Sequence, residues 1–451
     1  MVKQAKQGPR KPRPTSSPGA RRQAEPQTAG IRVRMFRVGF GDFFLLTVPH
    51  KDGKKHILID CGVHAKDLGT IRSAVEQMAD DCGRHLSLVI MTHRHADHIS
   101  GFASCSDIFS EITVDAVWMP WFENPTNKIA SAFQASLTAT ANQLAMRLNA
   151  RGNAEAEHLR MLENITGVPD PVQGFSSNQK ALDVLHNGFK NKVKPQYYKS
   201  GDQPSLPAEL TAAGLSAQII GPPIDPVLIA QMTNKAQQYL SDLTVEDDAS
   251  LKPFADAFRA IETQYPDEAF EFYSADQVRQ QIHDAQPLAL AARAAAADKT
   301  LNNQSLVIVF SMAGRNLLFA GDAQWGNWEH FLYGGAFGTP GHTEITGQAK
   351  AILSSIDFYK VGHHGSANAT PKDAVKAMRL GCCGMCSTQI DAYNEVPREP
   401  LLAALSERMN GQIARSDQVA ANASLGPNTA AGPLPAAFTA PTGVLFVDFE
   451  L

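Results

Sequence analysis

The sequence predicts an α/β domain that carries two helical insertions, and two observations lead to this prediction. Apolar segments with the alternation or the continuous burial of β-strands occupy residues 31–122 and 300–451, interleaved with segments of helical spacing. Two long blocks rich in Ala, Gln and Leu, residues 124–204 and 225–298, have helical spacing instead. Because strand-like sequence resumes after each block, we expect both blocks to be insertions into one domain of residues 31–451.

Composition narrows the class of protein further. The 451 residues are 43% hydrophobic and 19% charged, with a net charge of −4, which argues against a protein that coats nucleic acid by charge alone. Residues 1–30 combine Pro, Gly, Ser, Lys and Arg with almost no large apolar side chains, so we expect a disordered basic tail. No stretch approaches the roughly 20 apolar residues of a membrane span, and the six cysteines are too unevenly spread for a disulfide framework. We therefore predict a cytoplasmic protein without a membrane partner.

The sequence of residues 31–122 predicts a series of strands and one helix. Residues 31–49 give two strands around the turn "GFGD", and "HILIDCG" is a buried strand with Asp60 at its end. Residues 67–82 have helical spacing, residues 86–91 form another buried strand, and "EITVDAVWMPWF" is the next one.

The C-terminal part continues the alternation of strands and helices. A strand is expected in "LSAQIIGPP", a hairpin around Ala313–Gly314 in "SLVIVFSMAGRNLLFAGD", and a strand with its loop in "IDFYKVGHHGS". The remaining elements are a helix in "KDAVKAMR", a strand in "GCCGMCST", a helix in "PLLAALSERM" and a closing strand in "GVLFVDFEL".

Four potential metal ligands directly follow the buried strand of residues 86–91. They are His93, His95, Asp97 and His98, all within "THRHADH". Side chains two positions apart in an extended segment point the same way, so His93 and His95 can share one metal ion. Asp97 and His98, near the start of the next predicted helix, can face a second ion. Imidazole and carboxylate together suit zinc, manganese or iron, so the sequence predicts a metal site at this strand end.

These segments resemble the motifs of the metallo-β-lactamase superfamily. "THRHADH" resembles its signature loop, "HILIDCG" its early strand ending in a structural aspartate, "LLFAGDA" its strand that delivers a metal-bridging aspartate, and "YKVGHHGS" its late strand with the final histidine ligand. With "VGFGDFFLL", "IIGPP" and "NNQSLVIVF", they resemble the ComEC-like branch, which includes the nuclease-like domain of the competence DNA-uptake protein and related phosphodiesterases. The resemblance covers residues 31–122, 213–224 and 300–451, and it implies a four-layer αββα fold.

The resemblance also implies roles for individual residues. Asp322 would bridge the two metal sites, and His363 is favoured over His364 as the last ligand. His364 would then contact substrate or move a proton, with Asp97 and Asp322 as the other catalytic residues. The implied metal ligands are His93, His95, Asp97, His98, Asp322 and His363.

Two segments depart from the wider pattern. Many superfamily members complete the first metal site with a histidine before the GD motif, whereas "NNQSLVIVF" has none, as in the ComEC-like branch. Asn303 or Ser305 would stand near that position, and both are possible substrate contacts. The first metal ion would then be bound more weakly, so occupancy by a single ion or by Mn²⁺ is expected. In "DAYNEVPREP", Val396 stands where the branch often has a histidine. Ser366 could contact a phosphate or simply cap a turn.

Three functions follow from these expectations. The leading one is a metal-dependent phosphodiesterase or nuclease, in which hydroxide activated by one or two Zn²⁺ or Mn²⁺ ions attacks phosphorus. The second is a metal-dependent hydrolase of a lactone, ester or amide on the same fold. The third is a binding or regulatory module. The expected partners are a phosphodiester or small ester substrate, nucleic acid, and a second copy or another protein bound through the helical insertions.

Overall fold

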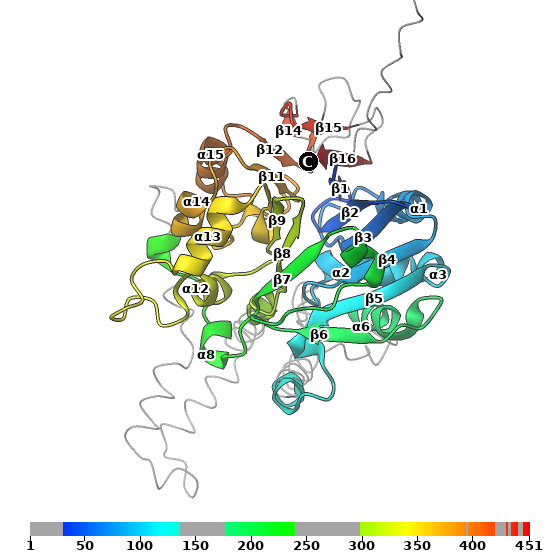
Figure 1. Cartoon of the computed structure of the whole chain (residues 1–451), viewed down its shortest axis with the longest axis horizontal. Coiled ribbons are helices and arrows are strands. Elements are labelled where there is room, and N and C mark those ends of the chain that lie inside the picture. Colours follow the sequence, from blue (N-terminus) through cyan, green and yellow to red (C-terminus); the bar gives the residue numbers. More distant parts are fainter. Residues whose placement is uncertain are drawn as a thin grey trace, which may run out of the picture.

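The computed structural model describes residues 30–135, 177–239, 298–393, 396–419, 430–431, 434–440 and 445–451. Within this part of the chain, two large sheets face each other and helices cover their outer sides (Figure 1). The predicted α/β class and its four-layer αββα arrangement are confirmed.

The first sheet has eight strands in the order β15-β16-β1-β2-β3-β4-β5-β6. Strands β3, β4, β5 and β6 run parallel, so their carboxyl ends meet at one edge, whereas β1, β2, β15 and β16 pair antiparallel. The strand bounds are β1 (Arg32–Phe36), β2 (Phe43–His50), β3 (Gly53–Cys61), β4 (His85–Ile90), β5 (Thr113–Pro120), β6 (Pro195–Tyr198), β15 (Phe438–Thr439) and β16 (Phe446–Glu450).

The second sheet has six strands in the order β12-β11-β10-β9-β8-β7. The predicted hairpin joins β8 to β9, and both turn residues, Ala313 (φ 51°) and Gly314 (φ 77°), have the left-handed backbone that such two-residue turns require. The bounds are β7 (Ser216–Gly221), β8 (Val307–Met312), β9 (Arg315–Phe319), β10 (Phe358–Lys360), β11 (Cys383–Cys386) and β12 (Ile413–Arg415). A separate pair joins β13 (Gln418–Val419) to β14 (Ala430–Ala431).

Three apolar cores hold the four layers together. The central core lies between the two sheets, and each outer core lies between one sheet and its helices. Successive residues of β9 alternate between cores: Leu317 and Phe319 face the central core, while Leu318 faces the outer one. Because both faces of such strands are covered, their sequences read as continuous apolar runs.

Helices from the two halves of the chain cover opposite sides (Figure 1). Those on the first sheet are α1 (Ile71–Asp81), α2 (Ala96–Ser104), α3 (Ser106–Phe109), α6 (Ser177–Asp183) and the π-helix η2 (Val184–Gly188). Those on the second sheet are α12 (Trp325–Tyr333), α13 (Gly347–Ser355), α14 (Lys372–Ala377) and α15 (Glu399–Arg408). The shorter elements are α7 (Ala208–Ala212), α8 (Pro226–Ile229), η1 (Trp121–Glu123), η3 (Lys235–Gln237) and η5 (Gly362–Gly365). None of the described helices is long and apolar enough to span a membrane.

Most of the two predicted insertions, and residues 1–29 of the predicted basic tail, lie outside the described residues. The described part of residues 124–204 includes helices, but it also includes β6, which pairs parallel to β5 at the edge of the first sheet. The helical spacing of residues 124–204 therefore does not extend to β6, a strand that we did not predict from the sequence. The limits of the two insertions remain predictions.

Candidate metal centre

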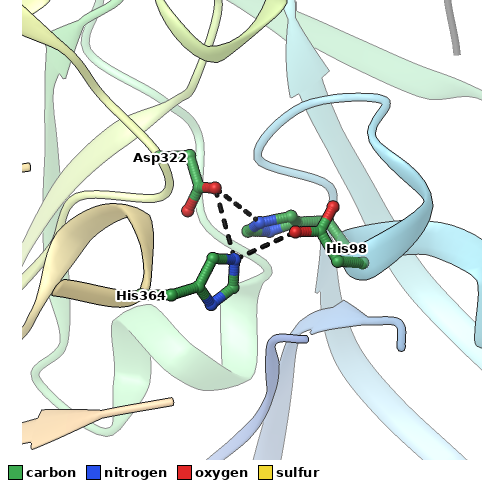
Figure 2. A group of neighbouring side chains, drawn as sticks. His98, Asp322 and His364 are labelled. Atoms are coloured by element: carbon green, nitrogen blue, oxygen red, sulfur yellow. Dashed lines mark hydrogen bonds and ion pairs between the residues drawn. The ribbon is translucent and has the colours of Figure 1, made fainter. Parts of the chain in front are cut away.

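Three segments that follow β4, β9 and β10 meet, and each brings one side chain to a common point (Figure 2). His98 comes from α2, Asp322 from the loop after β9, and His364 from η5. Asp322 Oδ2 lies 3.2 Å from His98 Nε2 and 3.4 Å from His364 Nε2. Sequence positions more than 200 residues apart are thus neighbours at the carboxyl ends of strands, as expected for sites in α/β folds.

Asp97 joins these three residues to form what we call the compact group. One ligand atom from each of Asp97, His98, Asp322 and His364 lies within 4.8 Å of the others. His98 Nε2 and Asp322 Oδ1 are buried and have no hydrogen-bond partner among the described residues. Buried polar atoms are normally satisfied, and leaving one unpaired costs about 1–3 kcal/mol. Two imidazoles, two carboxylates and orphaned atoms together fit a metal ion, so this group could bind Zn²⁺ or Mn²⁺.

Hydrogen bonds behind His98 fix the orientation of its ring. Its Nδ1 lies 2.7 Å from Asp60 Oδ2, and Thr92 donates to the same carboxylate from its backbone N–H (2.7 Å) and its hydroxyl (2.6 Å). With Nδ1 as the donor, Nε2 is the nitrogen that faces Asp322. Burial lowers the pKa of His98, but Asp322 and Asp60 outweigh burial and raise it well above its usual value, so Nε2 must release a proton before it can ligate an ion. Asp60 therefore has the supporting role that the sequence suggested for it.

His364 is held in a similar way from the second sheet. Its Nδ1 donates to the backbone oxygen of Ser387 at 2.8 Å, and its Nε2 donates to Asp97 Oδ2 at 3.0 Å. Burial lowers the pKa of His364, but Asp322 and Asp97 outweigh burial and raise this pKa to about 10. His364 must release the Nε2 proton before it can ligate an ion, so metal binding would release a proton.

A buried lysine lies next to the compact group. Lys360, on β10, forms an ion pair with Asp42, and its Nζ lies 3.0 Å from the oxygen of Gly321 and 3.6 Å from Asp322 Oδ1. Lys360 and Asp42 are each 2% exposed or less. Burial lowers the pKa of Lys360, but Asp42 and Asp322 outweigh burial and raise it above its usual value, so the ammonium stays charged. Sequence reasoning missed this pair, although a lysine inside the apolar run "DFYKVG" was a usable signal.

His93 and His95 lie beside the compact group but are not part of it. Their rings are in contact, with centroids 4.7 Å apart, and both are buried. His93 Nδ1 lies 3.2 Å from the Thr92 hydroxyl and 3.3 Å from the Ser305 hydroxyl. His95 Nε2 lies 3.1 Å from the backbone oxygen of Asp298 and 3.2 Å from its carboxylate Oδ1. The structure therefore brings only part of the predicted ligand set into one group.

The two histidines of "HHGS" occupy positions opposite to those expected. His364, and not His363, belongs to the compact group. His363 is instead held by Asn368 Oδ1, 3.1 Å from its Nδ1, and by Asn302 Nδ2, 3.2 Å from its Nε2. Both histidines have a left-handed backbone, with φ of 46° and 52°, which separates their ring centroids by 6.4 Å. Strand periodicity does not apply to such a turn, so the sequence could not order the two rings.

The predicted substrate contacts have structural partners of their own. Asn303 is fully buried and uses its whole amide: Nδ2 donates to the backbone oxygens of Ile229 and Gln231, and Oδ1 accepts from the backbone of Gln324 and Asn327. The Ser305 hydroxyl accepts from the backbone N–H of Asp322 at 3.0 Å.

The backbone of Ser366 closes a turn with His363 and Ala369. The roles of Asn303, Ser305 and Ser366 as substrate contacts remain predictions.

An open pocket is lined in part by Tyr393, and Phe40 connects this residue to His364. Phe40 packs on the His364 ring (centroids 4.2 Å apart) and on Tyr393 (4.8 Å), and Tyr393 lines the pocket. The pocket encloses about 400 Å³, and its wall includes Val396 and Arg415. Arg415 is already paired with Asp417 and Glu399.

Comparison with known proteins adds little. No family model and no curated protein matches the chain. Among solved structures, a beta-lactamase domain protein from Burkholderia ambifaria aligns over 42% of this chain and 47% of its own length, with 18% sequence identity and a TM-score of 0.22. The match thus spans about half of that protein, and a TM-score this low carries no argument about the present chain.

Proposed function

We propose that this chain is a metal-dependent hydrolase of the metallo-β-lactamase superfamily, and that it cleaves phosphodiesters as ComEC-like phosphodiesterases or nucleases do. One observation carries the metal dependence: one ligand atom from each of Asp97, His98, Asp322 and His364 lies within 4.8 Å of the others, and two buried polar atoms of this group lack a hydrogen-bond partner in the described residues. The motifs "LLFAGDA" and "VGHHGS" support the choice of phosphodiesters.

Each residue of the compact group has a distinct task in this proposal. When bound, Zn²⁺ or Mn²⁺ supplies a hydroxide nucleophile at neutral pH and neutralises charge that develops on the substrate. His98 and His364 would hold the ion through Nε2, because Asp60 and the Ser387 carbonyl occupy their Nδ1 atoms. Asp322 would add a carboxylate whose position Lys360 helps to fix.

Asp97 is the best placed residue to orient the attacking water. Its side chain is 14% exposed, whereas those of its three partners are at most 1% exposed. Burial raises the pKa of Asp97, but His98 and His364 hold this pKa far below its usual range. Asp97 therefore stays ionised at neutral pH and can accept a hydrogen bond from a water molecule at the solvent side.

One observation favours a second candidate, a hydrolase of lactones, esters or amides. The open pocket that Tyr393 lines also has the acidic residues Asp391 and Glu399 in its wall, and its arginine, Arg415, is already paired with acidic partners. Such a wall would repel a polyanion and suits a substrate with little negative charge.

The test is hydrolysis of bis(p-nitrophenyl) phosphate and of p-nitrophenyl acetate in the presence of Mn²⁺ or Zn²⁺. The proteins are the wild type, Asp322→Asn and the matched control Asp52→Asn, whose side chain is 70% exposed. The proposal expects metal-dependent cleavage of the phosphodiester that falls by roughly 100- to 1,000-fold in Asp322→Asn and is unchanged in Asp52→Asn. Cleavage of the acetate alone would favour the second candidate. A protein that neither binds metal nor cleaves either compound would be a binding or regulatory module.

A further inference from the structure

The segment "GFGD" (residues 39–42), which connects β1 to β2, has no task in the proposed function, yet it lies against the compact group. Phe40 packs on the ring of His364, with the ring centroids 4.2 Å apart. The backbone N–H of Asp42 donates to the backbone oxygen of Asp97 at 2.8 Å. One short segment therefore contacts two of the four residues of the compact group.

Close packing fixes the backbone of this segment. A Cβ atom at Gly41 would lie 2.3 Å from the backbone oxygen of Gly62 and 2.8 Å from that of Asp97, so only glycine allows this approach. The backbone oxygen of Asp42 accepts from the N–H of Gly62 at 3.0 Å. The hydroxyl of Ser387 donates to the backbone oxygen of Gly41. The backbone thus holds Asp42 at a defined place beside the site.

The carboxylate of Asp42 lies behind both imidazoles of the compact group. Its Oδ2 is 3.6 Å from Nδ1 of His98, and its Oδ1 is 3.6 Å from Nδ1 of His364. These distances are too long for hydrogen bonds, which both Nδ1 atoms make with Asp60 and the Ser387 carbonyl instead. Asp42 and the two histidines are each at most 1% exposed, so water screens the charge of Asp42 little. Asp42 therefore acts on both rings through its charge.

Asp42 is not placed to ligate an ion itself. Asp42, Asp60 and His98 form a second group of ligand atoms within 4.8 Å of one another, but Lys360 already supplies its cation by pairing with Asp42. The oxygen that faces His364, Asp42 Oδ1, is buried and has no hydrogen-bond partner in the described part of the chain. Such an oxygen costs stability, and this cost is explained if its charge serves the ring in front of it.

We propose that Asp42 is a positioning residue of the metal centre that supports both histidine ligands, His98 and His364, at once. A negative charge behind Nδ1 keeps this atom as the hydrogen-bond donor and strengthens Nε2 as a ligand. Asp60 contacts His98 in a similar way, whereas Asp42 acts on a ring that follows each of the two sheets. This inference rests on the proposed function, because it assumes that His98 and His364 bind an ion.

The first experiment compares the affinity for Zn²⁺ of the wild type, Asp42→Asn and the matched control Asp357→Asn by competition with a chromophoric chelator. Asp357 is also a buried carboxylate, and it pairs with Arg315 and Arg379 at 3.0 Å each. It precedes β10, whereas Lys360, the partner of Asp42, ends this strand. Circular dichroism checks that each variant is folded.

Asp42→Asn keeps the shape of the side chain and removes its charge, so the affinity for Zn²⁺ should fall by about 10- to 100-fold. Asp357→Asn should bind Zn²⁺ as the wild type does. The loss should persist without the lysine: Lys360→Met combined with Asp42→Asn should bind Zn²⁺ at least about 10-fold more weakly than Lys360→Met alone. This second comparison separates the effect of Asp42 on the two rings from an effect of an unpaired Lys360 on Asp322.

Nuclear magnetic resonance provides a readout that a loss of stability alone would not change. In the Zn²⁺-loaded protein labelled with ¹⁵N-histidine, the Nδ1–H signals of His98 and His364 report on the two rings. Asp42→Asn should shift both signals, Asp60→Asn mainly that of His98, and Asp357→Asn neither.

Two results would overturn the inference while leaving the proposed hydrolase intact. One is a folded Asp42→Asn with the wild-type affinity and unshifted Nδ1–H signals. The other is a double variant that binds Zn²⁺ as tightly as Lys360→Met, because the loss in Asp42→Asn would then come from the unpaired lysine. If Asp42→Asn does not fold, the comparison of the double variant with Lys360→Met decides in its place. A wild type that binds neither Zn²⁺ nor Mn²⁺ would refute the proposed function and the inference together.

Discussion

The compact group and the His93–His95 pair lie side by side, yet they are built differently. All four residues of the compact group lie just after a strand or in the first turn of a helix, and hydrogen bonds to Asp60 and Ser387 hold its two imidazoles. In the His93–His95 pair, hydroxyl groups lie next to Nδ1 of His93, and His95 contacts the carboxylate of Asp298. Asp298 is far from both histidines in the sequence. The first arrangement is held by segments that directly follow strands of the two sheets, and the second includes a contact with a residue far away in the sequence.

This difference indicates that the compact group should bind a metal ion more tightly than the His93–His95 pair. Ligands fixed by strands and by buried hydrogen bonds lose little conformational freedom when they bind an ion, so their affinity is high. We therefore expect the compact group to bind its ion tightly. Variants of the residues that form or contact the compact group test this expectation.

Removal of the buried lysine should have the largest effect. Lys360→Met removes the nearest cation from the buried carboxylate of Asp42 and leaves it only the longer contacts with His98 and His364. Breaking a buried ion pair costs about 3–5 kcal/mol of unfolding free energy. Urea denaturation of the wild type and the variant would measure this loss.

The double variant Lys360→Met with Asp42→Asn provides the control, because it removes both charges together. It should recover part of the stability. If the single and double variants were equally destabilised, the ion pair would not be the cause.

The two neighbouring histidines of "HHGS" should differ in their effect on metal binding. His364→Ala removes a ligand of the compact group, so its ion should bind at least about 100-fold more weakly. His363→Ala removes a ring held by Asn302 and Asn368 outside that group, so metal affinity should change by less than about threefold. Titration calorimetry with Zn²⁺ would compare them, and equal losses in both variants would contradict the placement described above.

The supporting carboxylate behind His98 should have a smaller effect. Asp60→Asn keeps the size of the side chain but weakens the acceptor for His98 Nδ1, and loss of such a partner lowers metal affinity by about 10- to 100-fold. The ion at His93 and His95 should be less affected. A uniform fall at both sites would mean that Asp60 supports the whole loop rather than one ring.

Much of this molecule could be predicted from its sequence, and the failures have physical causes. The apolar runs gave the strands, and the spacing of "THRHADH" at a strand end located the site, because both depend on local periodicity. Local periodicity failed at His363 and His364, whose left-handed backbones break the alternation. It also failed at β6, whose sequence "PQYY" has neither the length nor the apolar content of a buried strand.

Asp42, Lys360 and Asp298 were missed for a different reason. Their roles depend on contacts between residues far apart in the sequence, such as the 203 positions that separate His95 from Asp298. No pattern within a single segment reports such a contact, although a charged residue inside an apolar strand, as in β10, is a sign that a buried partner exists.

The central claim is that Asp97, His98, Asp322 and His364 hold a metal ion. The most direct test is a crystal structure of the protein loaded with Mn²⁺, with anomalous diffraction used to locate the ions. We expect a strong anomalous peak within about 2.0–2.4 Å of Nε2 of both His98 and His364, with His363 outside its coordination sphere. Absence of a peak between these four residues in a crystal that holds Mn²⁺ elsewhere, or a peak ligated by His363 in place of His364, would contradict the account.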